Sequence, residues 1–187
     1  MVLLELLLVV ALILLLTVLY WGGSGPTRQQ RERVACQQNL LSMYRALDIY
    51  AREQRGRFPA VAGATNAETA LDVLVPRYTI DTSVFICPIS KDKPLPPGES
   101  FRRRKISYAY YMGRREEPPE VLVTDAQVDT LSKSKGQVVF STTGRPPGNN
   151  HGSEGGNLLF ADGRVEWCAP RASASLVLTQ GVVLLNP

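Results

Sequence analysis

The sequence predicts an α+β protein in which an apolar helix precedes a long amphipathic helix that packs on a small antiparallel sheet. Three observations predict this class. Residues 1–21 are apolar apart from Glu5 and Thr17, residues 27–54 carry apolar side chains at helical spacing, and the later chain alternates segments of strand character with turn residues. The 187 residues leave room for one modest globular domain after the apolar run.

Residues 1–21 are long and apolar enough to predict a transmembrane helix. At 1.5 Å per residue they reach roughly 30 Å, the thickness of a bilayer's hydrocarbon core. The Leu, Ile and Val side chains favour insertion by roughly 5 to 9 kcal/mol, against at most about 3 kcal/mol for Glu5. Glu5 either reaches the headgroups or meets a cation, and the nearest cation is a chain-terminal amine. Residues 22–26, Gly-Gly-Ser-Gly-Pro, predict a flexible neck.

The next two helices follow from capping and periodicity. The spacing Thr27-x-x-Gln30 is that of a capping box, and Gly56 supplies a stop, which predicts a helix over 27–54. Its expected buried stripe consists of Val34, Leu40, Leu41, Tyr44, Leu47 and Ala51. A second capping box, Thr65-x-x-Glu68, predicts a short helix over 66–75.

Strand character predicts the sheet. Residues 106–112, 120–124 and 137–141 are expected as strands, and 157–168 as a hairpin. Asp162-Gly163 at its centre is the preferred sequence of a two-residue type I′ turn, in which both residues need positive φ. Residues 181–185 form either a last strand or a packed tail.

The basic residues argue against nucleic-acid binding. The net charge is +4, and much of it comes from Arg28, Arg31 and Arg33 and from the run 102–105. Neither group has the interleaved aromatic side chains on which bases stack. We expect the first group to lie at a membrane surface and no nucleic acid to bind.

The cysteines predict no metal site. Cys36, Cys87 and Cys168 are too few and too scattered for a zinc site, and the chain has no C-x-x-C pair. One disulfide with a spare thiol and three buried thiols both remain open.

The single histidine offers the only candidate chemistry. His151 with Asp125 and Asp162 could form an acid–base pair or a metal site, but a nucleophile, base and oxyanion donors do not cluster, so we expect no enzyme. We expect instead that Asp125 and His151 hydrogen-bond and hold the loop to the sheet. Calcium is a weaker candidate because it needs about six oxygens. Its ligands would be Asn149, Asn150, Glu154 or an aspartate.

Several short motifs together resemble one family. They are the apolar run around Glu5, Cys36-Gln-Gln-Asn-Leu40, Gly56-Arg-Phe-Pro59, Phe85-x-Cys87-Pro88, Ser107-Tyr108, Leu122-Val-Thr-Asp125, and His151-Gly running to Asp162-Gly163. In this order and spacing they resemble the prepilin-like proteins, which are the type IV pilins and the pseudopilins of type II secretion.

The resemblance implies a fold and a function. A prepilin peptidase would remove a leader and leave an N-methylated amine on residue 1, and the apolar helices would bundle as the core of a filament. Met1 and Glu5 would be the assembly residues, because the Glu5 carboxylate neutralises the amine of an adjacent subunit. Asp125, His151, Asp162 and Gly163 would form a structural motif. Other copies, related pilin-like subunits and membrane lipid would be the partners.

The resemblance also implies a location and a disulfide. The chain would be a single-pass inner-membrane protein with an extracytoplasmic domain. The family pattern favours a bridge between Cys36 and Cys87, with Cys87–Cys168 as the alternative. A second function class stays open: a membrane-tethered extracytoplasmic binding module that never polymerises.

Overall fold

The structure is a computed structural model that describes residues 2–22, 28–93, 95–116 and 120–187, with the side chains of 18–22 excepted. It divides into two compact units, Met1–Arg31 and Glu32–Pro187. We describe each unit by itself. The expected neck, apart from Gly22, lies outside the described residues, as do Met1 and the expected cap Thr27.

The first unit contains helix α1, Val2–Gly22. Every described side chain from 2 to 17 is exposed. No helix in the described part of the chain is both long and apolar enough to cross a membrane. The expectation of a single-pass inner-membrane protein is therefore wrong on this finding.

Helix α2, Arg28–Glu53, buries one face, as its periodicity predicts. Leu40, Leu47 and Ala51 are buried as expected, whereas Val34 and Leu41 are 49% and 40% exposed. The face that contacts the core is rotated from the expected stripe, and it includes Cys36, Met43 and Ala46. The helix ends where Arg55 and Gly56 take positive φ and Gly56 N–H donates to Ala51 C=O.

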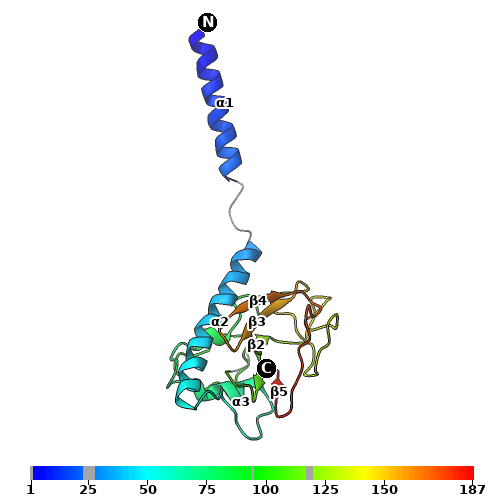
Figure 1. Ribbon diagram of the computed structural model, residues 1–187. Helices are drawn as coiled ribbons and strands as arrows, with labels where there is room; N and C mark the ends of the chain where they lie inside the picture. The colour runs from blue at the N-terminus through cyan, green and yellow to red at the C-terminus, as the bar shows by residue number, and fades with distance from the viewer. Residues whose placement is uncertain (1, 23–27, 94, 117–119) are drawn as a thin grey trace. The chain divides into compact units, whose positions relative to one another are not determined.

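The described strands form one antiparallel sheet of order β4-β3-β2-β1-β5 (Figure 1). The strands are β1 Tyr108–Met112, β2 Val121–Asp125, β3 Gly156–Phe160, β4 Val165–Cys168 and β5 Val183–Leu185. The last strand resolves the alternative left open for 181–185, because Leu184 pairs with Tyr111 at the sheet edge. The α+β class and the antiparallel sheet are confirmed.

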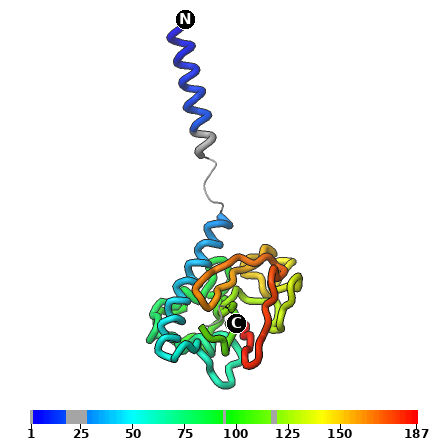
Figure 2. The backbone as a smooth tube through the Cα atoms, viewed as in Figure 1, coloured from blue at the N-terminus to red at the C-terminus, as the bar shows by residue number. Residues whose placement is uncertain are grey.

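Both faces of the sheet are buried. Tyr108 and Tyr110 of β1 enter one core with α2, and the alternate residues Ala109 and Tyr111 enter a second core. The segment between β4 and β5, orange to red in Figure 2, buries Ala172 and Leu176 in that second core. The sheet is therefore the middle layer of the domain.

Two expected β features differ in the structure. Residues 137–141 make a single bridge, Val138 with Arg171. Pro170 C=O accepts from the N–H groups of both Val139 and Phe140, which interrupts a regular ladder. The β3–β4 turn has three residues, not two. Gly163 alone takes positive φ (86°), while the carboxylate of Asp162 accepts from Arg164 N–H. A Cβ on Gly163 would also lie 2.6 Å from the Tyr44 ring.

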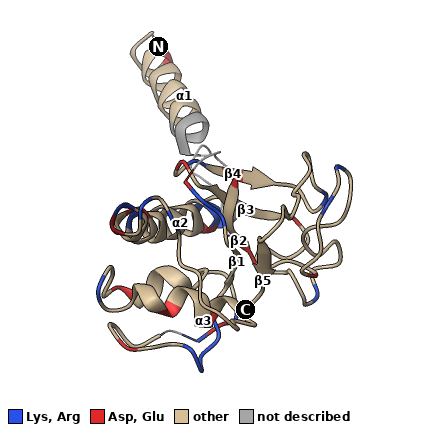
Figure 3. Ribbon diagram, turned by 60° about the horizontal axis from the view of Figure 1, so that its bottom comes forward, with Lys and Arg blue, Asp and Glu red and all other residues tan. Residues whose placement is uncertain are grey.

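Helix α3, Ala67–Leu71, begins one residue later than its capping box predicted. Asn66 is the cap and accepts from Thr69 N–H, and a 3₁₀ turn, Asp72–Leu74, continues the helix. Asp72 accepts from Phe101 N–H at 2.7 Å and from Arg102 Nε at 2.8 Å, which holds the basic run 102–105 beside the helix. Figure 3 shows Lys and Arg distributed over α2 and the loops.

Glu68 supplies a test of this packing. Its buried carboxylate accepts from Ile106 N–H at 3.2 Å, and Oε2 has no hydrogen-bond partner among the described residues. Burial raises the pKa of Glu68 above its usual value. Because the folded state then holds the proton more tightly than the unfolded state, with its pKa of about 4.3, ionisation of Glu68 destabilises the fold as pH rises.

We expect Glu68→Gln to stabilise the fold by about 1 kcal/mol at pH 7 and to lose that advantage below about pH 4. Urea unfolding at both pH values measures the difference. Glu99→Gln, at an exposed turn, is the control and should change neither value. If Glu68→Gln changed the free energy of unfolding equally at both pH values, the raised pKa of Glu68 would be contradicted.

Candidate functional site

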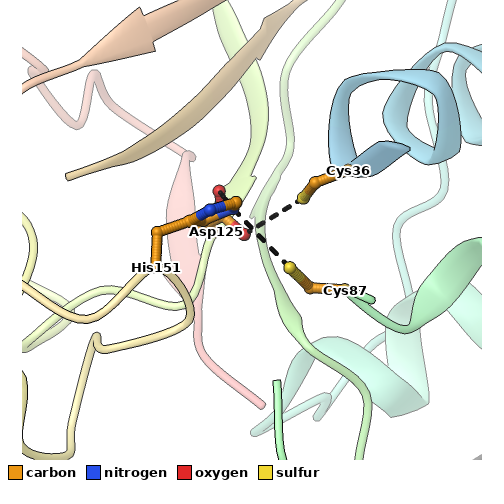
Figure 4. A group of neighbouring side chains, drawn as sticks. All are labelled: Cys36, Cys87, Asp125 and His151. Atoms are coloured by element: carbon orange, nitrogen blue, oxygen red, sulfur yellow. Dashed lines mark hydrogen bonds and ion pairs between the residues drawn. The ribbon is translucent and has the colours of Figure 1, made fainter. Parts of the chain in front are cut away.

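Four side chains from distant parts of the chain converge in the core (Figure 4). They are Cys36, Cys87, Asp125 and His151, and one donor atom from each lies within 4.8 Å of the others. Cys36, Cys87 and Asp125 have no exposed surface, and His151 is 8% exposed. The cluster is therefore enclosed by the domain.

Each member is held by a different backbone element. Cys36 lies on the buried face of α2, and Cys87 follows a 3₁₀ turn, Thr82–Phe85, just before Pro88. Asp125 is the last residue of β2, and His151 lies in the loop that leads into β3. The cluster thus joins the helix layer, the sheet and two loops at one point.

The carboxylate of Asp125 is at the centre. His151 Nε2 lies 3.3 Å from Asp125 Oδ2, and Cys36 Sγ lies 3.6 Å from Asp125 Oδ1. Cys87 Sγ lies 3.6 Å from the same His151 Nε2. The expected contact between Asp125 and His151 is therefore present, and it extends to two thiols.

Three neighbouring residues make hydrogen bonds with the cluster. Asn157 donates its backbone N–H to Asp125 Oδ2 at 2.6 Å and its amide at 3.1 Å, and the Asn150 amide donates to Oδ1 at 2.9 Å. The Tyr108 hydroxyl lies 3.2 Å from Cys36 Sγ. These partners satisfy a carboxylate that burial alone would destabilise.

A glycine permits the shortest of these bonds. Gly156 starts β3 directly beside Asp125, where an added Cβ would lie 3.0 Å from Asp125 Cβ and 2.7 Å from the Phe140 ring. The backbone can approach the carboxylate closely only because no side chain is present there.

Aromatic packing holds the histidine from the other side. The His151 ring meets the Trp167 ring edge-on, with centroids 5.1 Å apart. The Arg33 guanidinium lies over the same indole, 3.5 Å from its centroid. Strand β4 and helix α2 therefore both limit the positions open to His151.

The charges in the cluster are strongly coupled. The contact with Cys36 is the main cause that lowers the pKa of Cys87 to about 6; burial opposes it and His151 assists it. Burial raises the pKa of Cys36 well above its usual value. Burial disfavours a charged His151, but its contacts with Asp125 and Cys87 outweigh burial and raise its pKa to about 10.

The geometry is unsuited to nucleophilic catalysis of the Cys-His-Asp kind. Such a triad uses the two ring nitrogens separately, one toward the nucleophile and the other toward the carboxylate. Here Nε2 of His151 faces both Cys87 and Asp125. The arrangement is instead one of four groups facing a common centre, which suits metal binding or thiol oxidation.

The structure separates Asp125 from Asp162, the two aspartates of the expected structural motif. Asp162 and Gly163 lie in the β3–β4 turn, where Asp162 pairs with Arg164 at 3.7 Å, whereas Asp125 and His151 lie in the cluster. The expected structural motif is therefore divided between the buried cluster and an exposed turn.

The structure describes all three cysteines, each as a free thiol. Cys36 and Cys87 face one another in the first core, so their pairing stays a prediction. Cys168 packs in the second core, on the other face of the sheet, which disfavours the Cys87–Cys168 alternative.

Two of the expected calcium ligands make hydrogen bonds through their amide nitrogens, which leaves calcium binding a prediction. The Asn149 amide donates to Gly144 C=O, and the Asn150 amide donates to Ser107 C=O and to Asp125. Glu154 is exposed.

The family pattern already paired Cys36 with Cys87, but sequence reasoning missed that this pair meets Asp125 and His151. It also missed the supporting roles of Asn157 and Tyr108. No local spacing signals a cluster whose members lie at 36, 87, 125 and 151. The one available signal was Asn157, a polar residue at the start of the apolar strand Asn-Leu-Leu-Phe.

Comparison with family models, with curated proteins and with solved structures finds no match. The class defined by the fold is an α+β domain with a five-stranded antiparallel sheet in its described part.

Neutralising Asp125 should lower the free energy of unfolding much more than neutralising Asp162. Asp125→Asn places an amide nitrogen or a weaker acceptor against the Asn157 N–H donor, so we expect a loss of about 3 kcal/mol in unfolding free energy. Asp162→Asn keeps a residue that suits a turn, and we expect a change within about 0.5 kcal/mol. Urea denaturation measures both, and equal losses would refute the central role of Asp125.

Proposed function

We propose that the chain is a structural subunit of a filament of the type IV pilin or pseudopilin kind, assembled through α1. One observation carries the proposal: the described side chains of α1 are apolar all around the helix, except for Glu5 and Thr17, and all are exposed. A helix that is apolar on every side is normally buried on every side. The resemblance of the sequence to prepilin-like proteins supports the same conclusion.

Apolar exposure on this scale requires a partner. Val2, Leu3 and Leu4 are 76% to 79% exposed, and the leucines from Leu6 to Leu16 are 52% to 66% exposed. Burying one such side chain contributes about 1.5 to 3 kcal/mol. Packing α1 against several copies of itself would bury these side chains together, which favours a bundle over a pair of chains.

Glu5 gives this bundle a defined register. Thr17 satisfies its hydroxyl within its own helix by donating to Leu14 C=O, whereas Glu5 carries a charge. A carboxylate inside an apolar bundle needs a cation, and the amino terminus of an adjacent copy is the proposed partner. Removing one member of a buried pair costs about 3 to 5 kcal/mol.

The globular unit is suited to repeat along such a filament. Its sheet is covered on both faces, and its charged side chains are spread over α2 and the loops. Copies of the chain and related subunits are its proposed partners, and no catalytic step is part of the proposal.

Neutralising Glu5 tests the proposal. We expect Glu5→Ala and Glu5→Leu to abolish filaments that the wild-type chain forms, because the amine of each adjacent copy is then buried without a partner. Electron microscopy and sedimentation of the expressed chain measure this.

Thr17→Ala is the matched control, since Thr17 bonds only within its own helix. We expect this variant to assemble as the wild type does. Filaments of Glu5→Leu, or a wild-type chain found only as single molecules, would overturn the proposal.

A further inference from the structure

We propose that Cys36, Cys87, Asp125 and His151 bind one zinc ion that joins α2 to the sheet. The four donors come from four separate segments and face one enclosed point (Figure 4). The inference concerns the globular unit and goes beyond assembly through α1.

The distances match those of a tetrahedral site. With Zn–S of about 2.3 Å and Zn–N or Zn–O of about 2.0 Å, the donors lie roughly 3.3 Å apart for N and O and roughly 3.5 Å apart for S with N or O. Here His151 Nε2 and Asp125 Oδ2 are 3.3 Å apart. Cys87 Sγ is 3.6 Å from His151 Nε2, and Cys36 Sγ is 3.6 Å from Oδ1, the other oxygen of the Asp125 carboxylate. The four donors all lie within 4.8 Å of one another, so small side-chain shifts would close them around one ion.

The donor set selects the metal. Thiolates bind soft or borderline cations such as zinc, whereas calcium and magnesium take oxygen ligands. Two sulfurs, one imidazole nitrogen and one carboxylate oxygen complete the four positions that structural zinc prefers. All four ligands come from the protein and are buried, so the site is closed and structural.

The surrounding donors support metal ligands. Two thiolates and one carboxylate around Zn²⁺ leave one negative charge, which needs hydrogen-bond donors nearby. Asn150 and Asn157 donate to the Asp125 carboxylate, and the Tyr108 hydroxyl lies against Cys36 Sγ. Such outer hydrogen bonds orient ligands and tune affinity in metal sites. Zinc binds deprotonated thiolates and neutral imidazole, so binding releases to solvent the protons that the free cluster holds on these ligands.

A Cys36–Cys87 disulfide is the competing arrangement. It would use two of the four converging groups and leave His151 Nε2 directed at Asp125 alone. A zinc site would use all four converging groups as ligands. The two arrangements exclude one another, because a disulfide sulfur carries no thiolate to bind the metal.

Metal content of the full chain tests the proposal. We would express the chain without a histidine tag, purify it in mild detergent and measure zinc by mass spectrometry of the elements. We expect close to one zinc per chain in the wild type and in Cys168→Ser, a buried cysteine outside the cluster. We expect at least a tenfold loss in Cys36→Ser and in Cys87→Ser.

A second measurement covers variants that fail to fold. A mercurial titration of folded Cys168→Ser should release the zinc as its two remaining thiols react, with the release followed by a chromogenic chelator. Peptide mapping that finds a Cys36–Cys87 disulfide, or two reactive thiols with no zinc released, would overturn the proposal. So would full zinc content in the Cys36→Ser and Cys87→Ser variants.

Discussion

The globular unit depends on one buried carboxylate. Asp125 ends β2 with no exposed surface, and it accepts from the backbone and amide of Asn157 and from the amide of Asn150. Burying a charge without such partners would cost several kcal/mol. The same carboxylate faces Cys36 of α2 and His151 of the loop before β3. Contacts from helix α2, from strand β3 and from the loop before β3 therefore converge on Asp125.

The two units differ in whether their apolar side chains are exposed or buried. The first, Met1–Arg31, exposes the apolar side chains of α1, and Glu5 is the one charged residue in the sequence of that helix. The second, Glu32–Pro187, buries apolar residues on both faces of its sheet. A zinc ion among Cys36, Cys87, Asp125 and His151 would stabilise the second unit by joining segments far apart in the chain. It would do so whether or not the first unit has assembled.

Periodicity predicted most of the elements, and tertiary contacts decided the rest. The helical spacing found α2, and the strand patterns found β1, β2 and the β3–β4 hairpin near their bounds. The pattern over 137–141 failed because the N–H groups of Val139 and Phe140 both donate to Pro170 C=O, which leaves no regular ladder. The Asp162-Gly163 turn gained a third residue because the Asp162 side chain bonds to Arg164 N–H. The cluster could not be read from spacing, since its members share no segment. Asp125 was expected to meet His151, and the family resemblance paired Cys36 with Cys87, but nothing in the sequence joined the two pairs.

X-ray absorption at the zinc edge of the purified full chain tests the central claim most directly, because it reports the atoms around the metal. The account predicts two sulfurs at about 2.3 Å and two nitrogen or oxygen atoms at about 2.0 Å. A first shell of oxygen and nitrogen alone, or of four sulfurs shared between chains, would contradict it.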